Sequence, residues 1–433
     1  MPTEQIPQFR DIVAEIVDED QLSCIEWSAR KFLRHIATTR RLAAKVYPHI
    51  RRYSNLPINL KLVSLERVGA APGFSGATVT IGYFYRNHPD DHPSNPMVLK
   101  ISRPTIKKGR LFDKLNDEWN RAMQVASYAG QDKSNFAFPI HLDKANQRRE
   151  YSVLWSPFFS SKAFRYRPLL GLRVSSLANV LRGKETLANT SLSEFVTTAF
   201  DRLDDMHFRI GSGRLCRRRN ILCEYKRYLR GWSRGEREKW AAIWGPHTEQ
   251  MTKQFGRSWT NPIWLMDQLR YKRPRLTLGA VHGDIHPLNI IIQNDRSPGV
   301  IDFGWAEDES HVAKDFVLME CNFRFVFLKP DIPFSAILKL SRAIGGNLRS
   351  ELNSGSAQCD EYYQLIKDLR ELAIGRLGEG SDFDIEYVLP LFLTAFGLLR
   401  HLDSFENQVS AHLTVLGLSD YCRKNVLPKL TGT

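Results

Sequence analysis

The first part of the chain shows a helical pattern of apolar positions. Apolar side chains recur at three- and four-residue steps, as at Ile25, Ala29, Phe32 and Ile36, and this spacing places them on one face of a helix. The acidic run Asp18–Asp20 separates them from a shorter stretch of the same kind nearer the start. We therefore expect residues 1–55 to form a helical N-terminal extension.

The pattern then changes to short, β-branched and alternating stretches, which are typical of strands. Strands are expected at Leu60–Val68, Ala77–Tyr85, Met97–Ile101, Phe136–His141 and Tyr151–Trp155, with one helix at Lys107–Ala129. A sheet of this size with a single helix forms a small lobe, so residues 56–155 are expected to be one domain.

From residue 156 onwards the spacing of apolar residues is mostly helical. Leu192–Phe208 is strongly amphipathic, and Tyr387–Leu402 is apolar nearly all round, which indicates a buried helix. Residues 330–433 are expected to be mostly helical. The predicted fold class is α+β with two lobes: a small antiparallel-sheet N-lobe, which carries the helical extension, and a larger, mostly helical C-lobe at 156–433.

Composition is that of an ordinary globular protein, with 42% hydrophobic and 25% charged residues. No apolar run approaches the roughly 20 residues of a membrane span, and Met1–Arg10 lacks the apolar core of a secretion signal. The six cysteines are scattered, without a close pair of metal-ligand type, and are expected to be reduced thiols. These features predict a cytoplasmic protein without a membrane partner.

The positive charge of the chain is concentrated. Most of the formal net charge of +14 falls in residues 161–240, and its densest part is Arg214–Arg219 followed by Lys226–Arg230. Such a field favours an anionic substrate, an acidic protein partner or a nucleic acid.

Two polar motifs flank a predicted hairpin in the C-terminal half. The first, His282–Asn289, is His-Gly-Asp-Ile-His-Pro-Leu-Asn, and the second, Asp302–Gly304, is Asp-Phe-Gly. Between them, β-branched residues at Ile290–Ile292 and Val300–Ile301 surround a run of turn-forming residues. A hairpin joins its two ends, so the two motifs are expected to lie close together. An Asp-Phe-Gly alone would more often be an ordinary turn; the combination is more specific.

The residue types in these motifs suit phosphoryl transfer from a nucleotide. That reaction needs a base near the acceptor hydroxyl and oxygen ligands for magnesium. Asp284 is the candidate base, and Asn289 and Asp302 are the candidate metal ligands.

A candidate ion pair lies in the N-terminal half. Lys100 ends a predicted strand, and Glu118 falls on the apolar face of the predicted helix, whereas Asp113 and Asp117 point the other way. An inward carboxylate among apolar neighbours needs a partner. The alternative for Lys100 is a solvated strand lysine.

The His-Gly-Asp-x-x-x-x-Asn motif with its following Asp-Phe-Gly resembles the aminoglycoside phosphotransferase and choline kinase branch of the protein-kinase-like fold. Gly283 stands where protein kinases have arginine. The resemblance implies Asp284 as catalytic base, Asn289 and Asp302 as ligands of Mg²⁺, and ATP or GTP as phosphoryl donor. His286 falls where protein kinases carry a lysine near the transferred phosphate, so it is a second candidate catalytic residue, unless it only packs in the loop.

The resemblance also assigns nucleotide contacts. A glycine-rich turn with Gly73, Ser75 and Gly76 is expected to approach the phosphates, although it lacks the Gly-x-Gly-x-x-Gly spacing of protein kinases and could be a plain hairpin loop. Lys100, oriented by Glu118, would pair with the α- and β-phosphates. Residues 154–158 would form the hinge between lobes and bind the adenine edge, with Ser156 and Phe158 among the contacts.

Two further residues are expected to support the catalytic loop. Leu203–His207 copies a Leu-x-x-x-His helix ending found in this family, which implies that His207 is structural. Asp315, at the start of a helix after the Asp-Phe-Gly motif, is expected to brace the loop. An insert at about residues 209–278, here called the basic insert, separates His207 from the loop and is the expected determinant of substrate or partner, unless it is only a solvated helical hairpin.

The leading hypothesis is a kinase that transfers a γ-phosphoryl group to a hydroxyl of an unidentified acceptor, small or macromolecular, with an anionic one favoured by the basic stretch. The alternative is a nucleotide-binding module without turnover, because the glycine loop resembles a ternary-complex-associated branch of kinase-like proteins that acts in bacterial signalling or conflict complexes. The helical extension and the basic insert would then be the docking surfaces for its partner. Nucleic-acid binding through the arginines is a third, less favoured reading, and it predicts a steep loss of affinity with salt.

Overall fold

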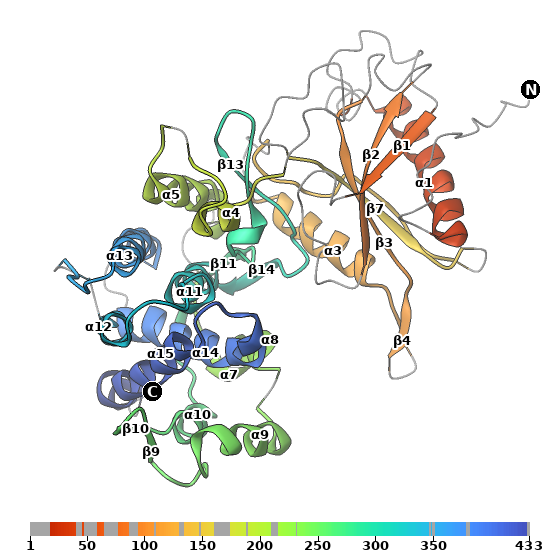
Figure 1. The fold of residues 1–433 in the computed structure, drawn as a ribbon. Helices are drawn as coiled ribbons and strands as arrows, with labels where there is room; N and C mark the ends of the chain where they lie inside the picture. Colours follow the sequence, from red (N-terminus) through yellow and green to blue (C-terminus); the bar gives the residue numbers. More distant parts are fainter. Residues whose placement is uncertain are drawn as a thin grey trace, which may run out of the picture. The chain divides into compact units, whose positions relative to one another are not determined.

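The chain forms two compact units (Figure 1). The computed structural model describes residues 18–39, 46, 59–64, 77–85, 94–107, 110–129, 134–146, 149–159, 174–187, 189–208, 215–230, 232–345, 348, 351–377 and 382–430. Unit 1 comprises Met1–Ser127, Gln131–Asn179 and Leu288–Trp305, and unit 2 comprises Tyr128–Gly130, Val180–Pro287 and Ala306–Thr433. The hairpin after the first motif, expected in the second lobe, therefore belongs to the compact unit that holds the larger sheet.

Unit 1 is built on a five-stranded sheet with the order β1-β2-β3-β7-β6. Every neighbouring pair in it is antiparallel. The strands are β1 Asn59–Ser64, β2 Thr78–Tyr85, β3 Met97–Ser102, β6 His141–Asp143 and β7 Ser152–Pro157.

The helix α1, Glu19–Thr38, covers one face of this sheet. Asp18 begins it as N-cap, accepting a hydrogen bond from the backbone N–H of Gln21. Apolar residues of α1 pack with alternate residues of β3 and β7, including the fully buried Trp155, whose Nε1 donates to Ser28 Oγ at 2.8 Å. The expected helical extension is thus present at α1, while its shorter first stretch lies outside the described residues.

The helix α3, Lys114–Ala126, lies on the other side of the sheet (Figure 1). The prediction that it begins at Lys107 was wrong, because Asp113 caps the helix by accepting from the N–H groups of two first-turn residues. The preceding residues form a hairpin of β4 Thr105–Lys107 and β5 Arg110–Phe112. Leu111, expected on the helix face, is 72% exposed on this hairpin.

The strand predicted at Phe136–His141 was also placed wrongly. Only its last residue joins the sheet, as the start of β6. Phe136 instead forms a bridge with Val300 in the hairpin of β12, Ile290–Ile292, and β13, Pro298–Val300. Apolar alternation cannot distinguish pairing with the main sheet from pairing with a distant hairpin.

Unit 2 is mostly helical around a three-stranded sheet with the order β14-β11-β8. Its strands are β8 Leu215–Arg218, β11 Arg275–Val281 and β14 Glu307–His311, with a separate pair of β9 Met251–Gln254 and β10 Arg257–Thr260. Its α-helices are α5 Leu192–Arg202, α6 Asp204–Phe208, α7 Ile221–Glu224, α8 Lys226–Leu229, α9 Arg234–Trp244, α10 Pro262–Leu269, α11 Ala313–Cys321, α12 Phe334–Arg342, α13 Ala357–Leu377, α14 Leu389–Leu398 and α15 Gln408–Tyr421. Short 3₁₀ or π segments are η4 Asn322–Val326, η5 Asp384–Val388, η6 Leu399–Ser404, η7 Cys422–Val426 and η8 Pro428–Leu430. Two short helices, α4 Leu177–Leu181 and η3 Pro287–Asn289, span the boundaries between units.

The expected α+β class, with a small antiparallel sheet and a mostly helical C-terminal part, is confirmed. The predicted helix Leu192–Phe208 is divided into α5 and α6 at Leu203. The segment Asp384–Ser404 is long and apolar enough to cross a membrane by length and composition alone, but 72% of its most apolar window is buried within the protein. It packs against α11 and α15, as expected for a core helix.

Candidate functional site

The β12–β13 hairpin brings Asn289 and Asp302 to the same end of unit 1. Ile290 pairs with Val300, and the N–H of Ile301 donates to the carbonyl of Asn289 at 3.0 Å. Asn289 therefore lies opposite the residue that precedes Asp302. The hairpin expected from the sequence is confirmed.

Asp302 has a left-handed backbone conformation, with φ of 64°. This conformation is uncommon for a residue other than glycine, although aspartate tolerates it better than most. The next residue holds the turn in place: the ring of Phe303 is buried, with its centroid 4.3 Å from that of Phe138 and 6.1 Å from that of Phe136. Packing of Phe303 thus fixes the turn from which the Asp302 carboxylate projects.

Lys100 joins the sheet, α3 and this turn. Its Nζ lies 2.6 Å from Glu118 Oε1 and 3.2 Å from Asp302 Oδ1. The side chains of Lys100 and Glu118 are 13% and 9% exposed. Burial disfavours the ammonium, but the carboxylates of Asp302 and Glu118 outweigh it and hold the pKa of Lys100 above its ordinary value. Lys100 is therefore a fixed cation, and Glu118 is the partner chosen from the sequence over Asp113 and Asp117.

The expected hinge residues lie at the end of β7. Lys100 pairs with Leu154 and Val98 with Ser156, and side chains of paired residues lie on one face of a sheet. Ser156, which is 8% exposed, therefore shares the face of Lys100, whereas Trp155 faces α1. Phe158 follows β7 and is partly exposed.

The glycine-rich turn cannot be placed in this way. Gly73, Ser75 and Gly76 lie outside the described residues.

In unit 2, Asp315 holds the backbone of the His-Gly-Asp loop. Its two carboxylate oxygens accept the N–H groups of His282 at 2.9 Å and Gly283 at 2.7 Å, and Oδ2 lies 3.0 Å from His207 Nε2. Burial disfavours the carboxylate, but the hydrogen bond with His207 outweighs it and keeps the pKa of Asp315 low. His207 and Asp315 are both buried, so they occupy the supporting positions expected from the sequence.

Asp284 projects from this braced loop. Its N–H donates to Nδ1 of His282 at 3.2 Å, and its carboxylate is 30% exposed, with Oδ2 3.8 Å from Nε2 of His286. The two candidate catalytic side chains are therefore neighbours that both remain accessible to solvent.

A contact that sequence reasoning missed comes from the basic insert. The hydroxyl of Tyr228, in α8, donates to the carbonyl of Gly283 at 2.7 Å within the interior of unit 2. No local motif marks Tyr228, because the contact joins residues 55 positions apart.

The donor set at the hairpin suits magnesium. Asn289 and Asp302 offer amide and carboxylate oxygens, the ligand type that Mg²⁺ prefers, and such sites usually complete six-fold coordination with phosphate oxygens and water. Within the described ranges, no group of three or more His, Cys, Asp or Glu side chains could hold a metal ion.

The basic insert is partly neutralised within its own unit. Arg217 and Arg219 both pair with Glu309, and Arg227 pairs with Glu307 at 3.1 Å. Its strand β8 adds to β11, so the insert is part of the fold of unit 2 and not a detached helical hairpin.

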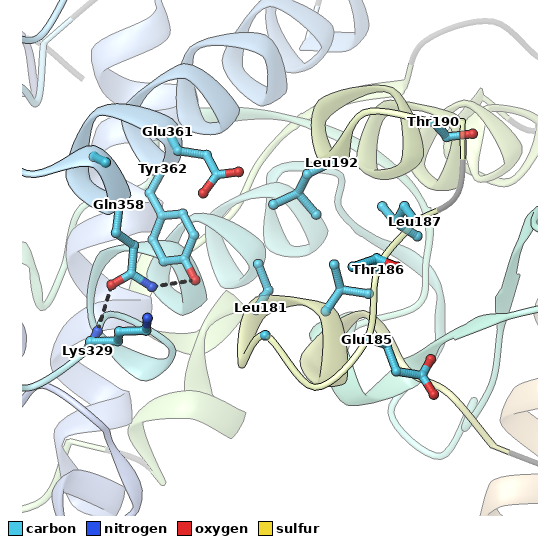
Figure 2. A pocket seen from close by; sticks show the side chains of 13 residues that line it. Leu181, Glu185, Thr186, Leu187, Thr190, Leu192, Lys329, Gln358, Glu361 and Tyr362 are labelled. Carbon is cyan, nitrogen blue, oxygen red and sulfur yellow. Dashed lines mark hydrogen bonds between the residues drawn. The ribbon is translucent and has the colours of Figure 1, made fainter.

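A separate cavity of about 700 Å³ opens in unit 2 (Figure 2). Figure 2 shows Gln358 on its wall, bonded to the backbone of Lys329 and to the hydroxyl of Tyr362. The rest of the lining mixes leucines with threonines and the carboxylates of Glu185 and Glu361. None of the expected site residues that the structure describes lines this cavity.

Part of the chain matches a known protein family model, and the chain is similar to solved structures. A family model described as ternary complex associated domain 9 matches residues 183–395. A search of the curated proteins finds no match. Among solved structures, the chain is similar to spectinomycin phosphotransferase APH(9)-Ia, crystallised with ADP and spectinomycin, at 9% identity and a TM-score of 0.37, over 83% of this chain and 92% of that one.

A second similar structure is a candidate aminoglycoside phosphotransferase of Ralstonia eutropha, at 14% identity and a TM-score of 0.41, over 83% of this chain and 95% of that one. Because both TM-scores are below 0.5, the function proposed below rests on the side-chain geometry.

Proposed function

We propose that the protein is a phosphotransferase that uses ATP or GTP with Mg²⁺ to phosphorylate a hydroxyl of its acceptor. The observation that carries this proposal is the contact of Lys100 with both Glu118 and Asp302. A strand lysine, a helix carboxylate and an Asp-Phe-Gly aspartate serve the phosphates of a nucleotide in kinases. A solvated strand lysine would be more exposed than the 13% of Lys100 and would not contact two carboxylates.

Each residue has a role that its surroundings favour. Lys100, kept charged by its two carboxylate partners, binds the α- and β-phosphates. Asn289 and Asp302 would hold the metal ion, which would supply positive charge to the phosphate oxygens. Ser156 and Phe158, at the end of β7, are the proposed contacts with the base of the nucleotide. Gly73, Ser75 and Gly76 remain proposed phosphate contacts on the basis of sequence.

Asp284 is proposed as the base that takes the proton of the acceptor hydroxyl. Its exposed carboxylate on a braced backbone suits that role, because a base must be fixed in direction yet open to substrate. His286, next to it, would donate a hydrogen bond to the transferred phosphate.

The acceptor proposed is anionic, either a small alcohol or a macromolecule. The overall charge of +14 favours it, although Glu307 and Glu309 neutralise part of the basic insert. Nucleic acid stays a less favoured partner. We propose a cytoplasmic location, in keeping with six free cysteines.

The second candidate is a nucleotide-binding module that works within a protein complex without turnover. The match of residues 183–395 to the ternary complex associated family model favours it. The basic insert lies within that match and would be the docking surface for the partner.

One experiment separates the two functions. The purified protein is incubated with radiolabelled ATP or GTP and Mg²⁺ in the presence of alcohols, nucleosides and cell extracts, beside Asp284→Asn and the control Asp308→Asn. Phosphotransferase activity predicts label transfer that Asp284→Asn lowers by at least about a hundredfold and that Asp308→Asn leaves intact. Tight nucleotide binding without transfer to any acceptor supports the module instead, and equal turnover in wild type and Asp284→Asn removes Asp284 as the base.

A further inference from the structure

Both backbone polar groups of Gly283 are held by buried side chains of unit 2. Its N–H donates to Asp315 Oδ1 at 2.7 Å, and its carbonyl accepts from the hydroxyl of Tyr228, also at 2.7 Å. Gly283 has φ of 77°, a conformation that favours glycine. The loop is therefore fixed from two sides, by α11 and by the basic insert.

The Tyr228 contact acts directly on the proposed base. The carbonyl of Gly283 and the N–H of Asp284 belong to one planar peptide group. Tyr228 holds the carbonyl end of that plane, and Nδ1 of His282 accepts from the N–H end at 3.2 Å. Fixing this plane fixes the direction in which the side chain of Asp284 leaves the backbone.

Tyr228 is itself held firmly. The guanidinium of Arg400 donates to the carbonyl of Tyr228 at 3.1 Å and to that of Leu229. Gly397 of α14 approaches so closely that a Cβ there would lie 2.6 Å from the carbonyl oxygen of Tyr228. Burial raises the pKa of Tyr228 well above its ordinary value, so the hydroxyl keeps the proton that it donates.

We propose that Tyr228 is a positioning residue for Asp284, and that the basic insert is in this way part of the catalytic apparatus. This inference rests on the proposed function, because it assigns the insert to the same site. It gives the insert a role in the rate of phosphoryl transfer that is distinct from acceptor or partner binding.

Tyr228→Phe removes the hydroxyl and keeps the ring. The matched control is Tyr225→Phe, which removes another buried hydroxyl of the insert, one that contacts His311 Nδ1 at 2.8 Å and not the catalytic loop. We expect Tyr228→Phe to lower kcat by about tenfold to a hundredfold with an unchanged KM for nucleotide. Tyr225→Phe should keep both constants near those of the wild type. A merely structural role would change the two variants alike.

Hydrogen exchange gives a readout that does not need turnover. The amides of residues 282–286 should exchange at least about tenfold faster in Tyr228→Phe than in the wild type or Tyr225→Phe, since one of their anchors is lost. A wild type without transfer activity would end the proposed function, while the exchange data would still decide the role of Tyr228. Equal exchange in the three proteins, or equal kcat in the two variants, overturns the inference. If Tyr228→Phe does not fold, Arg400→Gln, which releases the backbone of Tyr228, carries the same test.

Discussion

The ammonium of Lys100 lies 2.6 Å from the carboxylate of Glu118, and this contact joins the central strand β3 to the helix α3. The two residues belong to different elements that share no backbone pairing. Their side chains meet because the strand and the helix each direct one charged group into the space between them. A buried charge pair of this kind stays charged only while both partners are present.

The first prediction follows from this pair. Lys100→Met should weaken nucleotide binding by about tenfold to a hundredfold, because a charge-assisted contact to phosphate contributes about 1.5–3 kcal/mol. Lys61→Met, in β1 of the same sheet, is the control and should leave affinity unchanged. Titration with a fluorescent nucleotide analogue in the presence of Mg²⁺ measures both, and equal affinities for the two variants would contradict the role of Lys100.

The need for a partner could be reasoned locally, because an inward glutamate on an apolar helix face requires one. The choice of Lys100 as that partner came from the resemblance to the protein-kinase-like fold. The same local reasoning misplaced the start of α3, since Leu111 continues the apolar spacing but lies on an exposed hairpin. Periodicity alone does not reveal that Asp113 is the N-cap and that the helix therefore begins after it. It also could not show that Phe136 pairs with Val300, nor that Tyr228 reaches Gly283, because both contacts depend on the tertiary fold.

The attachment of α1 supplies the second prediction. Trp155 Nε1 donates to Ser28 Oγ at 2.8 Å, and both residues are fully buried. Ser28→Ala should lower the free energy of unfolding by about 1–3 kcal/mol, because it leaves a buried N–H without an acceptor. Ser127→Ala removes an exposed hydroxyl that bonds Gln124 and should change stability by less than about 0.5 kcal/mol. Urea unfolding measures the free energy of unfolding of both variants. Equal losses in Ser28→Ala and Ser127→Ala would show that the bond from Trp155 to Ser28 does not stabilise the fold.

The third prediction concerns acid stability and Glu224 of the basic insert. Burial raises the pKa of this carboxyl, but Lys314, whose Nζ lies 2.8 Å away, outweighs burial and brings the pKa to about 2, from 4.5. Because the pKa of Glu224 is lower in the folded than in the unfolded protein, the carboxylate stabilises the folded state. This stabilisation is fully present above the pKa of the unfolded protein, about 4.5, and is lost as pH falls from there towards 2. The shift corresponds to at most about 3 kcal/mol.

Glu224→Gln should therefore be less stable than the wild type by up to about 3 kcal/mol at pH 7, and the difference should narrow as pH falls below about 4.5. Glu238→Gln, an exposed change in α9, is the control. Urea unfolding at pH 7, 5 and 4 measures the difference. A gap between wild type and Glu224→Gln that stays constant across this range would show that Glu224 is not the titrating group.

The fourth prediction compares two helical glycines. Gly397 of α14 lies against the insert, and a Cβ there would be 2.6 Å from the carbonyl oxygen and 2.8 Å from the carbonyl carbon of Tyr228, whereas a Cβ at Gly375 of α13 meets nothing within 4 Å. Alanine favours a helix over glycine by about 0.5–1 kcal/mol, so Gly375→Ala should stabilise the protein by that amount. Gly397→Ala should destabilise it by about 1–3 kcal/mol, because overpacking against backbone exceeds the helical gain. Thermal unfolding shows whether each variant is more or less stable than the wild type. If Gly397→Ala is as stable as Gly375→Ala, then α14 does not pack tightly against the backbone of Tyr228.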